Sequence, residues 1–334
     1  MSVYEEKESY TTSRVGGIGG TDMAAILGLS PWKAPIDVWK GKVDPGSVPE
    51  LDKECLFWGS ALEPIVRQRY ALHYETDVLA PSELGTLFPK SRPWRDSTLI
   101  VGAEDWMLGA PDGWIPSGNR GLEIKCSARK SAEWGEDESN EIPAHYLVQG
   151  AWYAAVTGAR GWNYAVLFSG NTLKQYFYER DADLEKNMID VGRAFWFDYV
   201  LKAVEPPVDQ TESYGRYLAK KFSLSTGDVI ANPTEELLGW ARNMKSASAE
   251  KNAWEERERE ANNHLRALVG PAQKALTPLG TIGWVRPKAK TDVNWQAIAE
   301  RYLLDVTPER RGEIISELSW LRQDSPYLRA WWKK

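Results

Sequence analysis

The sequence predicts a mixed α/β fold, in which helices flank a mixed sheet, followed by a C-terminal extension that is mainly helical. Strand and helix signals follow one another without the strict alternation of an all-parallel sheet, which favours a mixed one. Glu205-Pro206-Pro207 ends a helical pattern, and this predicts a boundary between domains 1–205 and 206–334. A length of 334 residues fits two modest domains.

The first domain is expected to begin with helices. They are predicted over residues 21–27, 34–40 and 58–74. In the first helix we expect Thr21 to be the N-cap and Gly28 the stop, because hydroxyl side chains favour helix starts and glycine favours helix ends.

Strands with further helices follow. Strands are predicted over 97–101, 106–108, 110–115, 122–126, 162–168 and 172–179, and helices over 146–156 and 183–204. The turn-rich segment 116–121 predicts that the strands on either side of it form a hairpin. In the extension we expect a long charged helix over 234–268, a short hairpin including 279–285, and terminal helices including 295–304.

Composition excludes several classes of protein. Two cysteines and three separated histidines exclude a disulfide framework, a four-cysteine zinc site and an iron–sulfur cluster made by this chain alone. No apolar run approaches the roughly 18 residues that a membrane-spanning helix needs. The acidic first residues are not typical of a signal peptide, so we expect a cytoplasmic protein.

The charge is uneven along the chain. A pI near 5.4 argues against a nucleic-acid partner. However, residues 1–205 hold 21 Lys+Arg and 30 Asp+Glu, whereas residues 206–334 hold 20 and 17. The segment 261–291 has five Lys or Arg and no acid. The average therefore hides a more basic C-terminal part.

The pattern Asp112-x10-Glu123-Ile124-Lys125 is the most informative part of the sequence. Residues two apart on a strand share a face, so Glu123 and Lys125 should point together toward solvent or a cleft. The hairpin can bring Asp112 beside Glu123. Two carboxylates and the Ile124 carbonyl form the oxygen environment that Mg²⁺ or Mn²⁺ prefers, and a lysine there can orient a water.

Each part of this pattern also has a simpler interpretation. Acids and a lysine on an exposed hairpin form a surface salt bridge more often than a hydrolytic site. Glu63, on the helix before the hairpin, could simply be exposed. Tyr146, Gln149 and Tyr153 share a helix face and could form a packed aromatic stripe.

Five ordered motifs resemble a known family. They are RVGGIGGTD at 14–22 with the following AAILGLSPWK, WGxxxE at 58–63, APDG at 110–113, LEIKC at 122–126 and IPxxYxxQ at 142–149. In this order they resemble the YqaJ-like (lambda-type) alkaline exonucleases of the PD-(D/E)xK nuclease superfamily, over roughly residues 14–200. The resemblance implies a restriction-endonuclease-like PD-(D/E)xK core.

The resemblance also implies a set of site residues. The catalytic residues would be Glu63, Asp112, Glu123, Lys125 and Gln149. Asp112, Glu123 and the Ile124 carbonyl would hold a metal ion, and Glu63 would complete a second metal position. Lys125 would position the attacking water, and the glutamine would support the site.

Arg14 and Thr21 would fall where the family binds the 5′-phosphate of the strand being digested. The residues favour this independently, because four glycines before a helix start let backbone amides approach an anion, and Arg14 could clamp a phosphate. Asp22 would repel a phosphate unless it is turned away. The simpler alternative is an ordinary glycine-rich turn before a capped helix.

The family implies a metal-dependent exonuclease that degrades one strand of linear double-stranded DNA from 5′ to 3′. Such an enzyme would leave 3′ overhangs for phage-type recombination. The resemblance further implies two Mg²⁺ ions per site, with Mn²⁺ as an alternative, a trimeric ring and a single-strand-annealing protein as partner. An endonuclease of restriction or repair type, or a non-catalytic DNA-end-binding protein on the same fold, would be the alternative.

The extension has a basic segment that could contact DNA. Its residues are Trp284, Arg286, Lys288 and Lys290, which could touch the DNA backbone or stack on a frayed base. An oligomerisation arm, a dock for the annealing protein and a helical cap on the core are open alternatives.

Overall fold

The computed structural model describes residues 14–47, 54–94, 97–223, 230–286, 290–295, 307–317, 319–322 and 327–332. The chain divides into two units, Met1–Thr226 and Gly227–Lys334, and each is described by itself. The first unit extends beyond the predicted boundary after Glu205. It does so because Tyr214, on helix α7, is buried in its core and donates a hydrogen bond to the Pro206 carbonyl (2.8 Å).

The predicted helices and strands of the first unit occur in the predicted order, together with a strand over 92–94 and a helix over 212–221 that were not predicted. The helices are α2 (Gly20–Ile26), α3 (Pro35–Val43), α4 (Glu54–His73), α5 (Ala144–Thr157), α6 (Ala182–Ala194) and α7 (Glu212–Lys221). The strands are β1 (Arg92–Trp94), β2 (Ser97–Val101), β3 (Leu108–Gly109), β4 (Gly113–Ile115), β5 (Arg120–Ser127), β6 (Gly161–Phe168) and β7 (Thr172–Glu179).

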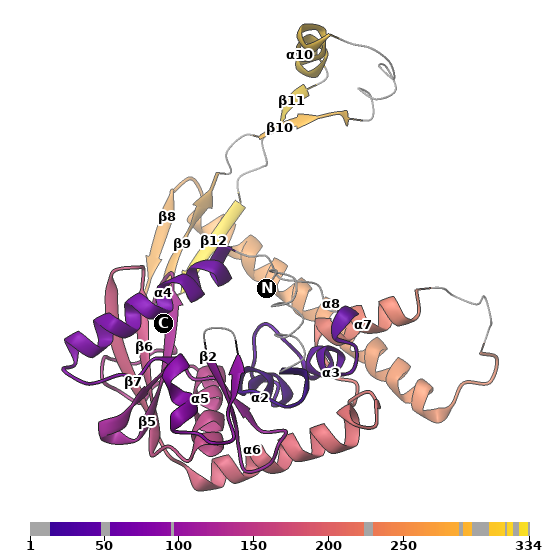
Figure 1. The fold of residues 1–334 in the computed structure, drawn as a ribbon. Helices are drawn as coiled ribbons and strands as arrows, with labels where there is room; N and C mark the ends of the chain where they lie inside the picture. Colours follow the sequence, from indigo (N-terminus) through magenta and orange to yellow (C-terminus); the bar gives the residue numbers. More distant parts are fainter. Residues whose placement is uncertain are drawn as a thin grey trace. The chain divides into compact units, whose positions relative to one another are not determined.

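A four-stranded sheet with the order β4-β5-β6-β7 lies in the first unit (Figure 1). β4 and β5 form the predicted antiparallel hairpin, with Gly113 opposite Leu122. β5 and β6 are parallel, so the chain must cross over between them, and α5 is part of that crossover. β7 returns antiparallel to β6. The sheet is therefore mixed and flanked by helices, which confirms the predicted fold class.

Helices cover both faces of this sheet. On one face, Leu122 and Ile124 of β5 pack with Val66 and Tyr70 of α4. Side chains alternate along a strand, so Glu123 points to the opposite face, toward α5. Both faces of β5 are thus buried.

The three-stranded sheet β1-β2-β3 also lies near α5. Trp152 of α5 is fully buried, and its indole N–H donates to the carbonyls of Leu108 (3.0 Å) and Ile18 (3.2 Å). This one side chain joins α5 to β3 and to the segment before α2. The buried indole therefore keeps a hydrogen-bond partner, as such groups require.

Helix α2 begins one residue earlier than predicted. Gly19 is its N-cap, so Thr21 does not cap it. The Asp22 carboxylate, at the third helical position, instead accepts the Gly19 N–H (3.2 Å), which is the part of a capping box that an acidic side chain supplies.

Helix α6 is shorter than the predicted helix over 183–204. It ends at Ala194 and continues as a π-helical turn over Phe195–Val200. Phe195, Trp196 and Val200 of this wider turn are buried. The turn therefore keeps these large side chains in the core while it ends the regular helix.

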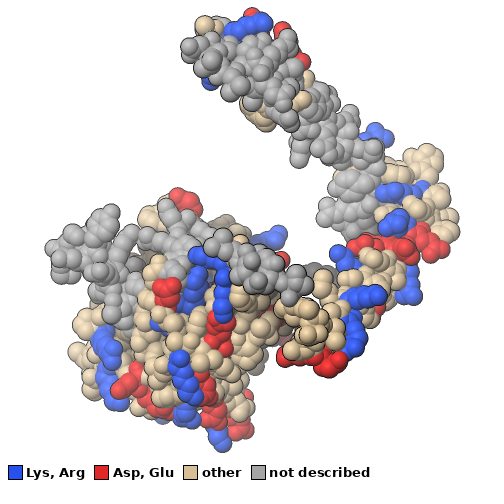
Figure 2. Space-filling model, turned by 90° about the vertical axis from the view of Figure 1, so that its right-hand side faces the viewer, with Lys and Arg blue, Asp and Glu red and all other residues tan. Residues whose placement is uncertain are grey.

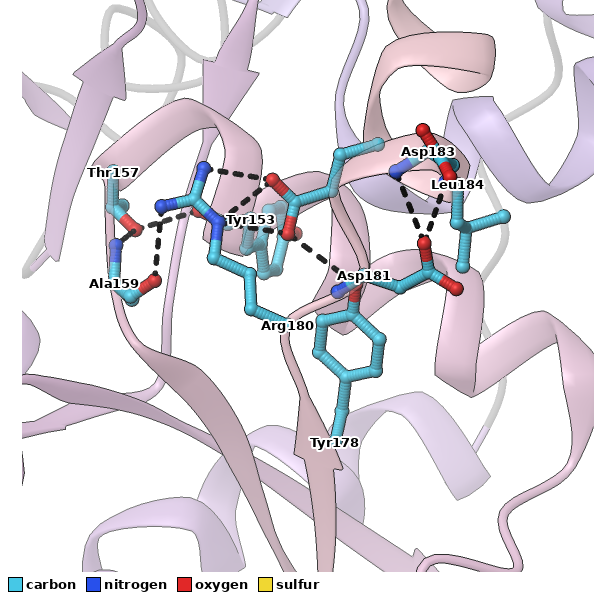
Figure 3. Close-up of polar contacts among 9 residues, drawn as sticks. Tyr153, Thr157, Ala159, Tyr178, Arg180, Asp181, Asp183 and Leu184 are labelled. Carbon is cyan, nitrogen blue, oxygen red and sulfur yellow. Dashed lines mark hydrogen bonds and ion pairs between the residues drawn. The ribbon is translucent and has the colours of Figure 1, made fainter.

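A polar network joins the end of β7 to the start of α6 (Figure 3). Arg180 contacts the Glu185 carboxylate at 2.7 and 2.8 Å, and Glu185 is only 4% exposed. The Tyr178 hydroxyl lies 3.3 Å from the same carboxylate, and Asp181 caps α6 by accepting two backbone N–H groups. The buried acid thus has a cationic partner, which its burial requires.

The second unit begins with the long helix α8 (Glu235–Val269). Thr234 caps it by accepting the Leu237 N–H (3.2 Å), and Gly270 follows its end, so its limits lie within one residue of the predicted helix over 234–268. The other elements are β8 (Lys274–Thr277), β9 (Gly280–Val285), β10 (Lys290–Val293), α10 (Pro308–Glu317), β11 (Ser319–Arg322) and β12 (Tyr327–Trp332).

The end of the extension differs from the prediction. The expected hairpin is part of a three-stranded sheet, because β12 pairs antiparallel with β9. The last described element is therefore a strand and not a helix, and its sequence YLRAWW is rich in aromatic residues that favour strands. Of the predicted helix over 295–304, residues 296–304 lie outside the described part of the chain.

Within the described residues, no helix combines the length and the apolar character that crossing a membrane requires. Figure 2 shows Lys and Arg side chains interspersed with Asp and Glu over the coloured part of the face that it draws. Attraction of a polyanion to this face would therefore depend on the local placement of charges and not on one broad basic area.

We predict that Arg180→Met lowers the free energy of unfolding of the first unit by about 1–2 kcal/mol. The buried Glu185 carboxylate would lose its partner, and the partial exposure of Arg180 keeps the effect in the lower part of the usual range. Urea unfolding measures the change. Arg216→Met is the control, because Arg216 and its partner Glu212 are both exposed and little change is expected. Equal stability of wild type and Arg180→Met would refute the role of the network.

Candidate active site

The β4–β5 hairpin brings two predicted acids together. Asp112 directly precedes β4, and its Oδ2 accepts the backbone N–H of Ile124 on β5 (2.8 Å). The Asp112 N–H donates to the Leu122 carbonyl (3.1 Å), which continues the same pairing. The hairpin therefore fixes Asp112 beside Glu123, as its sequence predicts.

Glu123 is buried, whereas we expected it to point to solvent or a cleft. Its side chain is 2% exposed, because α5 covers this face of the sheet. Lys125 Nζ lies 2.5 Å from Glu123 Oε1, and Gln149 Nε2 donates to the same oxygen at 2.5 Å. The structure thus brings these three predicted side chains into direct contact.

Lys125 lies between the acids and an aromatic ring. Its ammonium group is 5.0 Å from the centre of the Tyr146 ring. Burial disfavours its charged form, but the charges of Glu123 and Asp112 outweigh burial and raise the pKa of Lys125. At neutral pH Lys125 is therefore a cation, which can orient a water or stabilise negative charge but does not accept a proton.

Three carboxyl groups share this region, because Glu63 of α4 adds to the two acids of the hairpin. Burial, followed by the charge of Asp112, raises the pKa of Glu123 to about 8 and the pKa of Glu63 to about 7. Burial also raises the pKa of Asp112. Neighbouring like charges disfavour ionisation, so the cluster favours an additional positive charge.

The oxygen atoms of the cluster suit a divalent cation. Glu123 Oε2 is buried, and no described residue donates a hydrogen bond to it. Carboxylate and carbonyl oxygens are the ligands that Mg²⁺ prefers. As the described side chains stand, no group of three Asp, Glu, His or Cys residues could hold a metal ion. Asp112 and Glu123 would therefore need the Ile124 carbonyl, water or substrate oxygens to complete a site.

The segment from Arg14 to Thr21, which was predicted to bind a phosphate, lies next to this cluster. α2 packs against α5 so closely that a Cβ on Gly20 would be 2.9 Å from the Gln149 carbonyl oxygen. Arg14 NH2 donates to the Thr21 hydroxyl (3.4 Å), so the two predicted phosphate ligands are adjacent. The Arg14 guanidinium also lies over the Trp94 ring, 5.3 Å from its centre.

Asp22, which would repel a phosphate if it faced one, is turned into the protein. It is 6% exposed, and its Oδ2 lies 2.8 Å from Lys42 Nζ. Burial alone would raise the pKa of Asp22, but the charges of Lys42 and Arg14 outweigh burial and hold this pKa well below its usual range. Lys42 was not predicted, because it lies 20 residues away and no local pattern links it to Asp22.

Two further residues of the site were not predicted in these roles. Arg67 NH1 donates to the Asp112 carbonyl (2.6 Å). It follows Glu63 by four residues on α4, and this spacing could have indicated a shared helix face. Tyr146 was predicted only as part of an aromatic stripe, whereas its ring lies beside Lys125.

The predicted DNA contacts of the extension have different environments. Trp284 packs in a small hydrophobic cluster and donates its indole N–H to the Gly270 carbonyl (3.0 Å), so it joins β9 to the end of α8. Arg286 is exposed. Lys288 and the side chain of Lys290 lie outside the described residues.

Two solved structures resemble this chain in part. The crystal structure of an alkaline exonuclease (LHK-Exo) from Laribacter hongkongensis is 18% identical, covers 64% of this chain and 99% of that chain, and has a TM-score of 0.44. The crystal structure of a phage related exonuclease from Haemophilus somnus 129PT is 10% identical, covers 56% of this chain and 96% of that chain, and has a TM-score of 0.37.

Sequence relatives were found by two comparisons. Residues 9–160 match the family model described as the YqaJ-like viral recombinase domain. The Bacillus subtilis (strain 168) protein described as "Uncharacterized protein YqaJ" is 31% identical over 221 residues, which cover 65% of this chain and 64% of that protein. The chain thus spans slightly less than two thirds of this relative's length. Over residues 9–160, the chain is therefore similar to the YqaJ-like viral recombinase domain.

Proposed function

We propose that the chain is a metal-dependent 5′→3′ exonuclease, which degrades one strand of linear double-stranded DNA and leaves 3′ overhangs for phage-type recombination. The cluster of Asp112, Glu123 and Lys125 is the observation that supports this most strongly. Asp112 and Glu123 are neighbouring carboxyl groups, and their burial disfavours the charged forms and raises their pKa values. Ionisable groups with shifted pKa values concentrate at functional sites.

Mg²⁺ is the proposed cofactor, with two ions per site and Mn²⁺ as an alternative. Asp112, Glu123 and the Ile124 carbonyl would hold one ion, and Glu63 would help to hold the second. Ions bound there would supply positive charge that stabilises the phosphate oxygens during hydrolysis. The raised pKa values of Glu63 and Glu123 support this role, because a cation would offset the crowding of like charges.

The side chains of this cluster would position the reactants. Protonated Lys125 would orient the attacking water and offset negative charge that develops on the phosphate. Gln149 holds the Glu123 carboxylate through Oε1, which leaves Oε2 for a ligand. Arg67 anchors the backbone at Asp112. The side chains of Asp112, Glu123, Lys125 and Gln149 are thus each held by another group, and this limits their motion.

Arg14 and Thr21 would bind the 5′-phosphate of the strand that is degraded. Their side chains are adjacent, and the packing of α2 on α5 brings their segment close to the carboxylate cluster. A phosphate that is recognised only at a strand end would restrict cleavage to that end. This arrangement favours an exonuclease over an endonuclease.

The proposed substrate, partner protein and oligomeric state rest on the resemblance to the YqaJ-like family. Duplex DNA ends would be the substrate, and a single-strand-annealing protein would receive the 3′ overhang. The protein would form a trimeric ring and would act in the cytoplasm of a bacterial host or phage-infected cell.

We predict that Lys125→Met slows the digestion of linear duplex DNA by about 100-fold or more, because the cation that orients the water is lost. Release of acid-soluble nucleotides in the presence of Mg²⁺ measures the rate. Lys202→Met is the matched control, since Lys202 is 61% exposed and pairs only with a surface acid among the contacts described for it. A Lys125→Met protein that digests DNA as fast as wild type would refute the assignment.

Glu123→Gln should weaken the binding of Mg²⁺ by about tenfold or more, because it removes a ligand charge and keeps the size of the side chain. Isothermal titration calorimetry measures binding, and a chelator should abolish the digestion of DNA by wild type. Glu212→Gln is the control, because Glu212 is exposed on α7. Unchanged Mg²⁺ affinity in Glu123→Gln would exclude Glu123 as a ligand.

End-labelled DNA tests the polarity. A label at the 5′ ends of a linear duplex should be released early, whereas a label at the 3′ ends should stay on long fragments. A covalently closed circle should remain intact, and the same circle cut once should be digested. Early loss of the 3′ label would overturn the polarity, and nicking of the closed circle would favour an endonuclease.

A further inference from the structure

We propose that Lys42 is a positioning residue that makes recognition of a 5′-phosphate possible, because it neutralises Asp22 and holds the backbone of Arg14. The inference rests on the proposed binding of a 5′-phosphate by Arg14 and Thr21. It identifies a residue outside the five motifs as a determinant of the preference for phosphorylated ends.

One ammonium group joins three segments of the chain. Lys42 Nζ, near the end of α3, lies 2.8 Å from Asp22 Oδ2 and also donates to the Arg14 carbonyl oxygen at 2.8 Å. The side chains of Lys42 and Asp22 are only 7% and 8% exposed. Lys42 therefore fixes the start of α2 and the residue whose guanidinium would meet the phosphate.

The two charges of this pair depend on each other. Burial lowers the pKa of Lys42, and the Asp22 charge opposes this effect. In turn, Lys42 is the group that most strongly favours the ionised form of Asp22. Removal of one partner would leave the other as a buried, uncompensated charge, which is strongly unfavourable.

The pair also sets the charge that an incoming phosphate meets. Arg14, Lys42 and Asp22 together have one net positive charge, whereas Arg14 and Asp22 without Lys42 have none. Arg14 already interacts electrostatically with Asp22. Without Lys42, the guanidinium would be drawn to the Asp22 carboxylate and would be less available to a phosphate. A hydroxyl end, which has no terminal phosphate, would depend much less on this balance.

The test compares the binding of duplex ends that differ only in the 5′ group. Fluorescence anisotropy with a chelator present gives the affinity of wild type for blunt duplexes with a 5′-phosphate or a 5′-hydroxyl. The variants are Lys42→Met, Lys42→Arg and the double variant Asp22→Asn/Lys42→Met. Lys40→Met is the matched control, because residues two apart on a helix face different directions. Thermal unfolding of each variant shows that it is folded.

We expect Lys42→Met to reduce the preference for the phosphorylated end by about tenfold, with little change in affinity for the hydroxyl end. Lys42→Arg should restore most of the preference, because it returns the cation. The double variant has no buried acid but also lacks the bond to the Arg14 carbonyl, so it should restore only the part of the preference that depends on charge. Should Lys42→Met fail to fold, the double variant still decides the question, because complete loss of the preference there would contradict the electrostatic role.

Two results would overturn the inference. One is an unchanged preference in folded Lys42→Met, and the other is an equal loss of affinity for both ends, which would indicate a merely structural role. Binding is measured without digestion, so the outcome is independent of nuclease activity. A wild-type protein that prefers phosphorylated ends but digests no DNA would refute the proposed function and not the role of Lys42.

Discussion

The burial of the Glu123 carboxylate within the sheet is the constraint on which the site depends. Glu123 is 2% exposed, and Lys125 and Gln149 both bind its Oε1. Lys125 reaches it because residues two apart on a strand share a face. Gln149 reaches it because the parallel pairing of β5 and β6 requires a crossover, and α5 in this crossover covers that face. The topology of the sheet therefore determines which side chains meet at Glu123.

A second buried acid is compensated in the same way, at the start of α2. Asp22 is paired with Lys42, as Glu123 is paired with Lys125. The two pairs differ in what remains unsatisfied. Asp22 has a cation and caps a helix, and its pKa is lowered, whereas Glu123 keeps an oxygen without a donor among the described residues, and its pKa is raised to about 8. The first pair is electrostatically complete, and the second favours a further cation.

Local patterns predicted much of the fold. The limits of β2 and β7 match the prediction residue for residue, the limits of α8 lie within one residue of it, and the β4–β5 hairpin follows from turn preferences. The ordered motifs predicted a set of catalytic side chains. In the structure, Lys125 and Gln149 contact Glu123, and Asp112 binds the backbone of the same strand. Except for the contact of Gln149 with Glu123, which joins two elements 26 residues apart, these features depend on residues close together in the sequence.

The differences arise where distant segments meet. The burial of Glu123 depends on α5, and the pairing of Asp22 depends on α3, so neither follows from strand or helix periodicity. The N-cap of α2 is Gly19 and not Thr21, because it depends on backbone geometry that the local sequence leaves open. The pairing of β12 with β9 joins residues 42 to 52 positions apart, which local propensity does not specify.

The central claim is that the crowded acids of the hairpin form a cation site, and the position of bound Mn²⁺ tests it most directly. Anomalous scattering from crystals of the protein grown with Mn²⁺ would locate the ion. The account predicts a peak in contact with carboxylate oxygens of both Asp112 and Glu123, and its loss in Glu123→Gln. Mn²⁺ bound elsewhere, with both acids free of the ion, would contradict the account.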